Sequence, residues 1–267
     1  MAVMEALQRL YRRPPFVAVV RLYGAIGLGS RFGGPLSDHG VAEIIERAFR
    51  RGRPNAVALA INSPGGSASQ SALIAARIRR LADEHRLPVY AFCEDAAASG
   101  GYWLASAADE IWADENSIIG SIGVIAAGFG LQEAIGRWGI ERRIHTAGER
   151  KSLLDPFRPE RPEDIARLER ILGSVHQNFI RQVLSRRGSR LASEDLFNGD
   201  VWVGREALDR GLIDGIGHLV PVMKEKLGDR VRFRVLEPRR SLLHRLGATG
   251  AVAEALEERA LWARFGL

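Results

Sequence analysis

The stretch AVALAINSPGG, residues 56–66, begins with six consecutive apolar residues and ends in a glycine-rich turn. A continuous apolar run of this length is typical of a strand buried on both faces, as in a parallel sheet. The turn leads into a long helical stretch that ends near residue 86. The sequence here predicts one strand–turn–helix unit of an α/β fold.

The same order of strand, turn and helix recurs along the chain. Upstream, the β-branched strand 16–23 is followed by a glycine-rich loop and by a helix that Ser37 or Asp38 caps and that ends near residue 51. Further strands are expected at 88–93, 110–113, 117–126, 140–146, 201–203 and 232–236, and further helices at 99–107, 131–138 and 163–187. The repeats predict an α/β fold with mainly parallel strands.

The order of these segments indicates one folded unit rather than two. Residues 1–15 form a short lead, 16–238 a single domain, and 239–267 a tail whose last part, 252–267, has an amphipathic helical pattern. The stretch 150–162 is polar and contains three prolines, which predicts an exposed loop.

Composition excludes several classes of site. The chain is 46% hydrophobic and 26% charged, as is usual for a soluble globular protein. Its single cysteine, Cys93, excludes an internal disulfide and lies at the end of a predicted strand, which favours a buried structural thiol. No spacing of cysteine and histidine indicates zinc, and no cofactor is expected.

The net charge is +6, and pairs of neighbouring arginines are scattered along the chain rather than gathered in one stripe. Scattered pairs indicate solvated faces, so no nucleic-acid partner is expected, whereas peripheral contact with an anionic membrane stays open. The longest charge-free span, 116–132, is interrupted by glycines and is interpreted as buried strand and turn. Because residues 1–15 lack the pattern of a signal peptide, we expect a cytoplasmic location.

Two glycine-rich turns are candidates for chemistry. In the first, residues 62–67, glycines would let backbone N–H groups face a ligand oxygen, although a plain tight turn explains the pattern equally well. The second, DAAASGGYW at 95–103, surrounds Ser99 with small residues at the start of a helix. Ser99 is therefore either a nucleophile or an ordinary helix cap.

A nucleophilic serine needs a base. None of the six histidines lies in a recognisable triad context, and His145 alone is kept as a reserve. Lysine is the other choice, since it can lose its proton when water is excluded, and arginine cannot. The chain has lysine only at 151, 224 and 226 among its 38 basic residues, so Lys151, beside Arg150, is an unusual choice of residue.

Several ordered motifs carry a resemblance to a known family. They are NSPGG at 62–66, ASGGY at 98–102, IGSIGV at 119–124, GERK at 148–151 and GDVWVG at 199–204. With these motifs the chain resembles the signal peptide peptidase A family, S49-type Ser-Lys peptidases, over roughly residues 16–227. The resemblance implies a Clp protease/crotonase-like fold of repeated β-β-α units.

The resemblance also implies roles for particular residues. Ser99 corresponds to the nucleophile, Lys151 to its base, and Ser121 to a hydroxyl that orients the lysine. The amides of Gly66 and Gly100 correspond to the oxyanion donors. The implied activity is that of a serine endopeptidase acting on remnant signal peptides or on cytoplasmic peptides and proteins.

Assembly is implied as well. The chain looks like a short family member without the membrane anchor, and such members form dome-like rings in which Ser and Lys can meet across a subunit boundary. We therefore expect a homo-oligomer, with an octamer as one size. Two alternatives stay open: a crotonase-like acyl-CoA enzyme and a catalytically silent peptide-binding scaffold.

Overall fold

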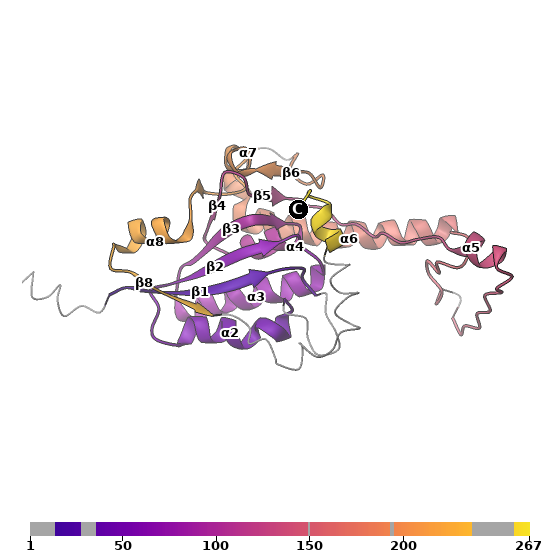
Figure 1. Ribbon diagram of the computed structural model, residues 1–267, viewed down its shortest axis with the longest axis horizontal. Helices are drawn as coiled ribbons and strands as arrows, with labels where there is room; N and C mark the ends of the chain where they lie inside the picture. Colours follow the sequence, from indigo (N-terminus) through magenta and orange to yellow (C-terminus); the bar gives the residue numbers. More distant parts are fainter. Residues whose placement is uncertain (1–13, 28–35, 149, 193–194, 237–258) are drawn as a thin grey trace, which may run out of the picture.

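The computed structural model describes residues 14–27, 36–148, 150–192, 195–236 and 259–267. Strands and helices alternate along the body of the molecule (Figure 1). In chain order the elements are β1 (Phe16–Tyr23), α2 (Asp38–Arg50), β2 (Ala56–Ser63), α3 (Ala68–His85), β3 (Val89–Ala98), α4 (Gly100–Ala105), β4 (Glu110–Ala113), β5 (Ile118–Gly120), α5 (Gln132–Arg137), α6 (Pro162–Arg187), η1 (Gly188–Arg190), β6 (Val201–Val203), α7 (Gly204–Asp209), β7 (Gly215–Ile216), α8 (Leu219–Leu227) and β8 (Arg232–Leu236).

The strands form one sheet in the order β6-β5-β3-β2-β1-β8, with β4 beside the first half of β3 and β7 beside β4. All pairings are parallel except the antiparallel pair of β5 and β6. The predicted α/β class with a mainly parallel sheet is confirmed. The strand expected at 88–93 continues to Ala98, because its second half finds a partner in β5.

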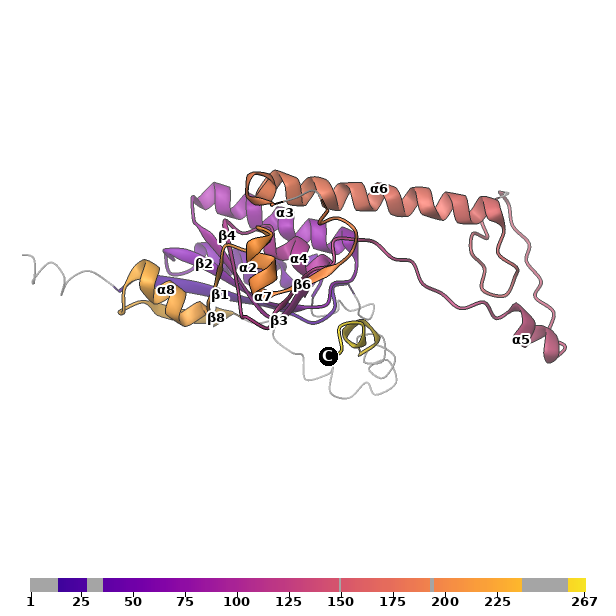
Figure 2. The ribbon, with the colours of Figure 1, turned by 90° about the horizontal axis from the view of Figure 1, so that it is seen from above.

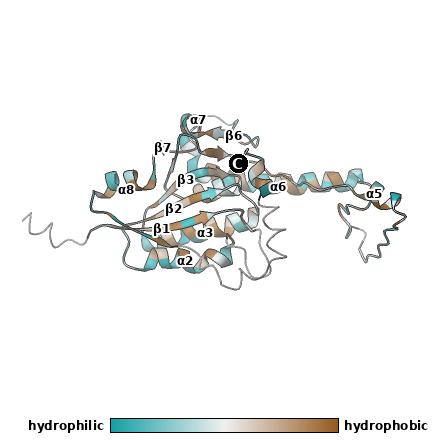
Figure 3. Ribbon diagram, viewed as in Figure 1, coloured by the Kyte–Doolittle hydropathy of each residue, from teal (hydrophilic) through white to brown (hydrophobic). Residues whose placement is uncertain are grey.

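Both faces of the central strands are covered, as their uninterrupted apolar sequences predict. On one face, α2, α3 and α4 pack with residues such as Val57, Leu59 and Ile61 in the larger core. On the other face, α8 covers a smaller cluster that includes Val17, Val19 and Met223. The strands accordingly form the most apolar layer of the molecule (Figure 3).

Helix ends follow local chemistry. The Ser37 hydroxyl accepts from the Gly40 amide at 3.2 Å, so Ser37 rather than Asp38 caps α2. At the start of α3 the Ser67 hydroxyl accepts from the amide of Gln70. The chain leaves α3 through Arg86, whose left-handed backbone (φ 52°) ends the helix before β3.

Two sequence predictions are wrong between residues 117 and 146. The strand expected at 117–126 is limited to β5, and the strand expected at 140–146 is absent. The span 116–132, expected to be buried, becomes exposed from Ile125 onward. After Ser121 the chain leaves the sheet, so its backbone has no neighbouring strand with which to pair (Figure 2).

Residues 122–148 and 150–161 instead form an arm beside the long helix α6. Figure 2 shows α5 beyond the outer end of α6, away from the sheet. With 26 residues, α6 is roughly 39 Å long. Its C-terminal half contributes Phe179, Val183 and Arg187 to the buried interior, whereas its outer half is largely exposed.

The predicted tail, 239–267, is described only at its end. Residues 237–258 lie outside the described residues, and 259–263 are helical. None of the helices in the described ranges combines the length and apolar character that crossing a bilayer requires.

One buried ion pair joins α6 to the sheet. Arg187 is 1% exposed, and its guanidinium donates to the Asp214 carboxylate at 2.6 Å and to the Gly211 carbonyl at 2.6 Å. The same carboxylate accepts from the amide of Ile111 in β4 at 2.7 Å. Removing the carboxylate would leave a buried positive charge without its counter-ion, which is strongly unfavourable.

We predict that Asp214→Ala lowers the free energy of unfolding by about 3–5 kcal/mol. The control is Glu115→Ala, which removes an exposed 3.0 Å ion pair with Arg205 and should cost less than about 1 kcal/mol. Urea unfolding followed by circular dichroism measures both. Equal losses in the two variants would contradict the assignment of the buried pair as a link between α6 and the sheet.

Candidate active site

Ser99 lies between the end of β3 and the start of α4, with its side chain half-buried. Its backbone has φ 52° and ψ −119°, a region that costs a non-glycine residue about 1–3 kcal/mol. Although Ser99 occupies the N-cap position, its hydroxyl makes no capping hydrogen bond to α4. The hydroxyl is therefore not used as a helix cap and is available for chemistry.

The backbone around Ser99 is tightly held. Its amide donates to the Gly120 carbonyl at 2.8 Å, and its carbonyl accepts from the Trp103 amide at 3.0 Å. The first glycine turn lies directly against it: a Cβ on Gly65 would be 2.7 Å from the Ser99 Cβ and 2.9 Å from the Gly100 nitrogen. Glycine is required at 65 because any side chain there would displace the serine.

The candidate oxyanion donors are the amides of Gly66 and Gly100, which lie on the two sides of the contact between Gly65 and Ser99. The Gly65 amide donates to the Ser63 hydroxyl at 3.2 Å, and the Gly65 carbonyl accepts from the Ile26 amide at 2.8 Å. Within the described residues, no backbone acceptor is recorded for the amide of Gly66 or for that of Gly100. Both N–H groups are thus free to donate to a ligand oxygen.

Ser121 is placed next to Ser99 by strand pairing. Ala98 of β3 pairs with Gly120 of β5, and each strand is followed by one of the two serines. Ser121 is 6% exposed, has φ 50°, and donates its amide to the Asp200 carbonyl at 2.7 Å. The structure therefore brings four of the five predicted site residues together: Ser99, Ser121, Gly66 and Gly100.

Lys151 lies on the arm and not with the other four. It is exposed, in a turn where its amide donates to the Gly148 carbonyl at 3.3 Å. Its amine has no hydrogen bond or ion pair within the described part of the chain. Contacts such as the Leu131 amide to the Pro156 carbonyl at 2.6 Å hold this loop to the arm rather than to the sheet.

The arm exposes large apolar side chains to solvent. Phe129 is 85% exposed, Trp138 81%, Ile125 64% and Ile140 57%. Side chains of this size gather on a protein surface mostly where another molecule covers them. The loop that carries Lys151 thus belongs to a segment suited to contact with a partner.

Two histidines are the other groups that were compared with Lys151 as a base for Ser99. His145 is exposed on the arm, as Lys151 is. The His176 Nε2 atom on α6 lies 3.0 Å from the Ile122 carbonyl oxygen. Among the described residues, no group of three or more histidine, cysteine or acidic side chains could hold a metal ion.

Cys93 is buried in the first half of β3, away from Ser99. It lies in β3, is 4% exposed, and burial raises the pKa of its thiol to about 12. The expected structural role is confirmed in the sense that the thiol is inaccessible and protonated at neutral pH.

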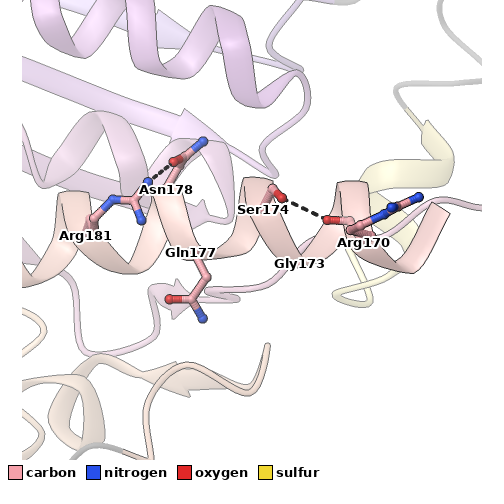
Figure 4. Close-up of a pocket in the computed structure, with 6 residues that line it drawn as sticks. All are labelled: Arg170, Gly173, Ser174, Gln177, Asn178 and Arg181. Carbon is pink, nitrogen blue, oxygen red and sulfur yellow. Dashed lines mark hydrogen bonds between the residues drawn. The ribbon is translucent and has the colours of Figure 1, made fainter. Parts of the chain in front are cut away.

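A surface hollow on α6 is unrelated to these residues (Figure 4). It is lined by residues of a single helix: Arg170, Gly173, Ser174, Gln177, Asn178 and Arg181. Figure 4 shows that the Ser174 hydroxyl donates to the Arg170 carbonyl and that Arg181 donates to Asn178. These polar groups are engaged within the helix itself, so the hollow offers no argument for a ligand.

Two contributions to the site were not identified from sequence. The Asn62 side chain accepts from the Ala96 amide at 3.2 Å and donates to Asp95 at 2.6 Å, closing an irregularity between β2 and β3. Trp202 of β6 packs on Gly120. Both belong to motifs quoted above, but their roles depend on strand pairings that the sequence alone does not specify.

The sequence and the fold were compared with those of known proteins. The sequence profile of peptidase family S49 matches residues 82–228. Serine protease SPPA, chloroplastic, of Arabidopsis thaliana is 36% identical over 222 residues, covering 79% of this chain and 32% of that protein. The Na(+)/H(+) antiporter NhaA of Brucella melitensis is 45% identical over 271 residues, covering 94% of this chain.

The chain spans 37% of the length of the Brucella protein and 32% of the Arabidopsis protein. Among solved structures, a serine-to-alanine mutant of the 1510-N membrane-bound stomatin-specific protease superposes with a TM-score of 0.53 at 17% identity. The superposition covers 85% of this chain and all of that one. At this identity the likeness shows a shared fold, in agreement with the expected Clp protease/crotonase-like architecture.

We predict that Cys93 resists thiol reagents in the folded protein. With its pKa near 12, about one thiol in 10⁴ is ionised at pH 8, and burial also blocks access. Reaction with a chromogenic disulfide should be very slow in buffer and complete in concentrated guanidinium. Equal rates in the two solutions would show that the thiol is accessible in the native state.

Proposed function

The chain belongs to peptidase family S49, and on that premise we propose that it is a serine endopeptidase with Ser99 as nucleophile and Lys151 as general base. The observation that carries the proposal is the strained backbone of Ser99 between two glycine amides that have no recorded backbone acceptor. Strain of this kind persists only where surrounding structure maintains it, and it is concentrated at functional sites.

The proposed reaction is acyl transfer from a peptide. The Ser99 oxygen attacks the carbonyl carbon while its proton passes to the neutral Lys151 amine, and the amides of Gly66 and Gly100 donate to the oxyanion. Lys151 then gives that proton to the leaving nitrogen as the C–N bond breaks. Water, deprotonated by Lys151, attacks the ester, and the proton returns to Ser99 as the ester bond breaks.

We propose that the lysine comes from a second copy of the chain. In the single chain, the arm reaches beyond the outer end of α6, away from the sheet (Figure 2), and Lys151 is an exposed residue of this arm. The exposed Phe129 and Trp138 provide apolar surface that a neighbouring copy could cover. Covering the arm would also remove water from the amine, which favours the neutral form that a base requires. In this proposal, the Ser121 hydroxyl orients the incoming amine.

The assembly expected from this arrangement is a closed homo-oligomer. A copy that contributes its arm to one neighbour and receives an arm from another makes head-to-tail contacts, which close into a ring when the rotation allows. An octamer is the expected size. The substrates proposed are peptides, including remnant signal peptides.

We predict that Ser99→Ala and Lys151→Arg each abolish peptide hydrolysis, because arginine retains the charge but cannot accept a proton. A loss of at least about 10³-fold in kcat is expected for each. The matched control is Lys224→Arg, the same substitution at an exposed lysine of α8, which should leave kcat unchanged. Activity that survives Lys151→Arg would mean that another group accepts the proton.

A mixing experiment tests where the lysine comes from. Ser99→Ala and Lys151→Arg proteins, each inactive, are dissociated, combined in equal amounts and reassembled. If each site joins two copies, about a quarter of the wild-type rate should appear, because half of the hydroxyls are intact and half of their neighbours supply lysine. If the two residues meet within one chain, the mixture stays inactive, and that result would rule out the shared site.

A further inference from the structure

Two serines of the site both have a positive φ, which strains the backbone of a non-glycine residue. Ser99 has φ 52° and Ser121 has φ 50°, and both lie in the left-handed region that non-glycine residues avoid. The two are joined through Gly120, whose carbonyl accepts from the Ser99 amide at 2.8 Å and which directly precedes Ser121. Whatever holds the Gly120 peptide in place therefore positions both hydroxyls.

The neighbouring edge strand β6 supplies that restraint. Trp202 of β6 pairs with Ile119 of β5. Its ring lies so close to the next residue that a Cβ on Gly120 would be 2.8 Å from both Cε3 and Cζ3. Two residues earlier, the Asp200 carbonyl accepts from the Ser121 amide at 2.7 Å. Figure 1 shows β6 alongside β5 on the outer side of the sheet.

Trp202 also has the features of a core residue. It is 6% exposed, belongs to the larger apolar core, and has the Arg210 guanidinium 5.5 Å from its ring centre. Its contact with Gly120 is nevertheless a contact with backbone, in the residue that connects the two serines. A smaller side chain at 202 would leave space into which the Gly120 peptide could rotate and relax both left-handed conformations.

We propose that Trp202 is a positioning residue of the active site, which keeps Ser99 and Ser121 in their strained conformations by pressing on the Gly120 backbone. The inference rests on the proposed function, because it assigns a consequence for Ser99-dependent hydrolysis. Trp202 touches neither substrate nor reacting atoms and acts only through Gly120.

The test compares peptide hydrolysis and labelling of the whole chain with those of its variants Trp202→Ala and Trp202→Phe. Misplacing a reacting group by about 1 Å can cost 10²-fold in rate, so Trp202→Ala should lower kcat for a peptide substrate by about that factor. The rate at which a fluorophosphonate labels Ser99 should fall in parallel, with KM changed by less than about threefold. Trp202→Phe retains an aromatic ring over Gly120 and should restore most of the rate.

The matched control is Trp112→Ala. Trp112 of β4 also packs on glycines, Gly215 and Gly217, but lies beside the first half of β3, away from Ser99. It should lower stability in urea while leaving kcat unchanged. A purely structural role for Trp202 predicts the same behaviour at both positions.

Each outcome decides the proposal. A folded Trp202→Ala protein with kcat and labelling within about twofold of wild type would overturn it. If Trp202→Ala fails to fold, kcat and the labelling rate are measured for Trp202→Leu instead. This variant keeps apolar volume at position 202 but lacks the aromatic ring. If Ser99→Ala leaves hydrolysis and labelling at the wild-type level, that result contradicts the proposed function instead.

Discussion

The candidate site depends on the way in which β3 divides its hydrogen bonds. The first half of the strand, up to Cys93, pairs with β4, and the second half, Ala96–Ala98, pairs with β5. An irregularity opposite β2, closed by the Asn62 side chain, separates the two halves. Because β5 is short and is followed at once by Ser121, this division brings the second serine beside the first.

The same pairing explains why strain can be maintained at Ser99. The strained backbone of Ser99 is held in place when its amide has a fixed hydrogen-bond acceptor. The Gly120 carbonyl is that acceptor, at 2.8 Å. Gly65 closes in from the opposite side, so the serine backbone is held between two glycine-containing segments. Small residues are needed here because the approach of three backbone segments leaves no room for side chains.

The arm, in contrast to the site, is not held by hydrogen bonds to the sheet within the described ranges. Its segment 122–161 leaves the sheet, and among the described residues its backbone pairs with no strand of the body. Large apolar side chains on the arm stay exposed in the single chain. Burying each of them would stabilise the protein by about 1.5–3 kcal/mol. A surface of this kind is stable in solution mainly when another molecule covers it, which is the physical basis for the proposed contact between copies.

The sequence by itself determined the strand–helix alternation, the buried strands, Ser37 as one of two expected caps, and the two glycine turns at the site, because these follow from local periodicity and backbone freedom. It also singled out Ser99, Ser121 and Lys151. Only the tertiary structure decided that β3 reaches Ala98, that residues 140–146 form no strand, and that Lys151 is exposed on the arm. These outcomes depend on which distant segments supply hydrogen-bond partners and apolar cover, and a local pattern contains no information about either.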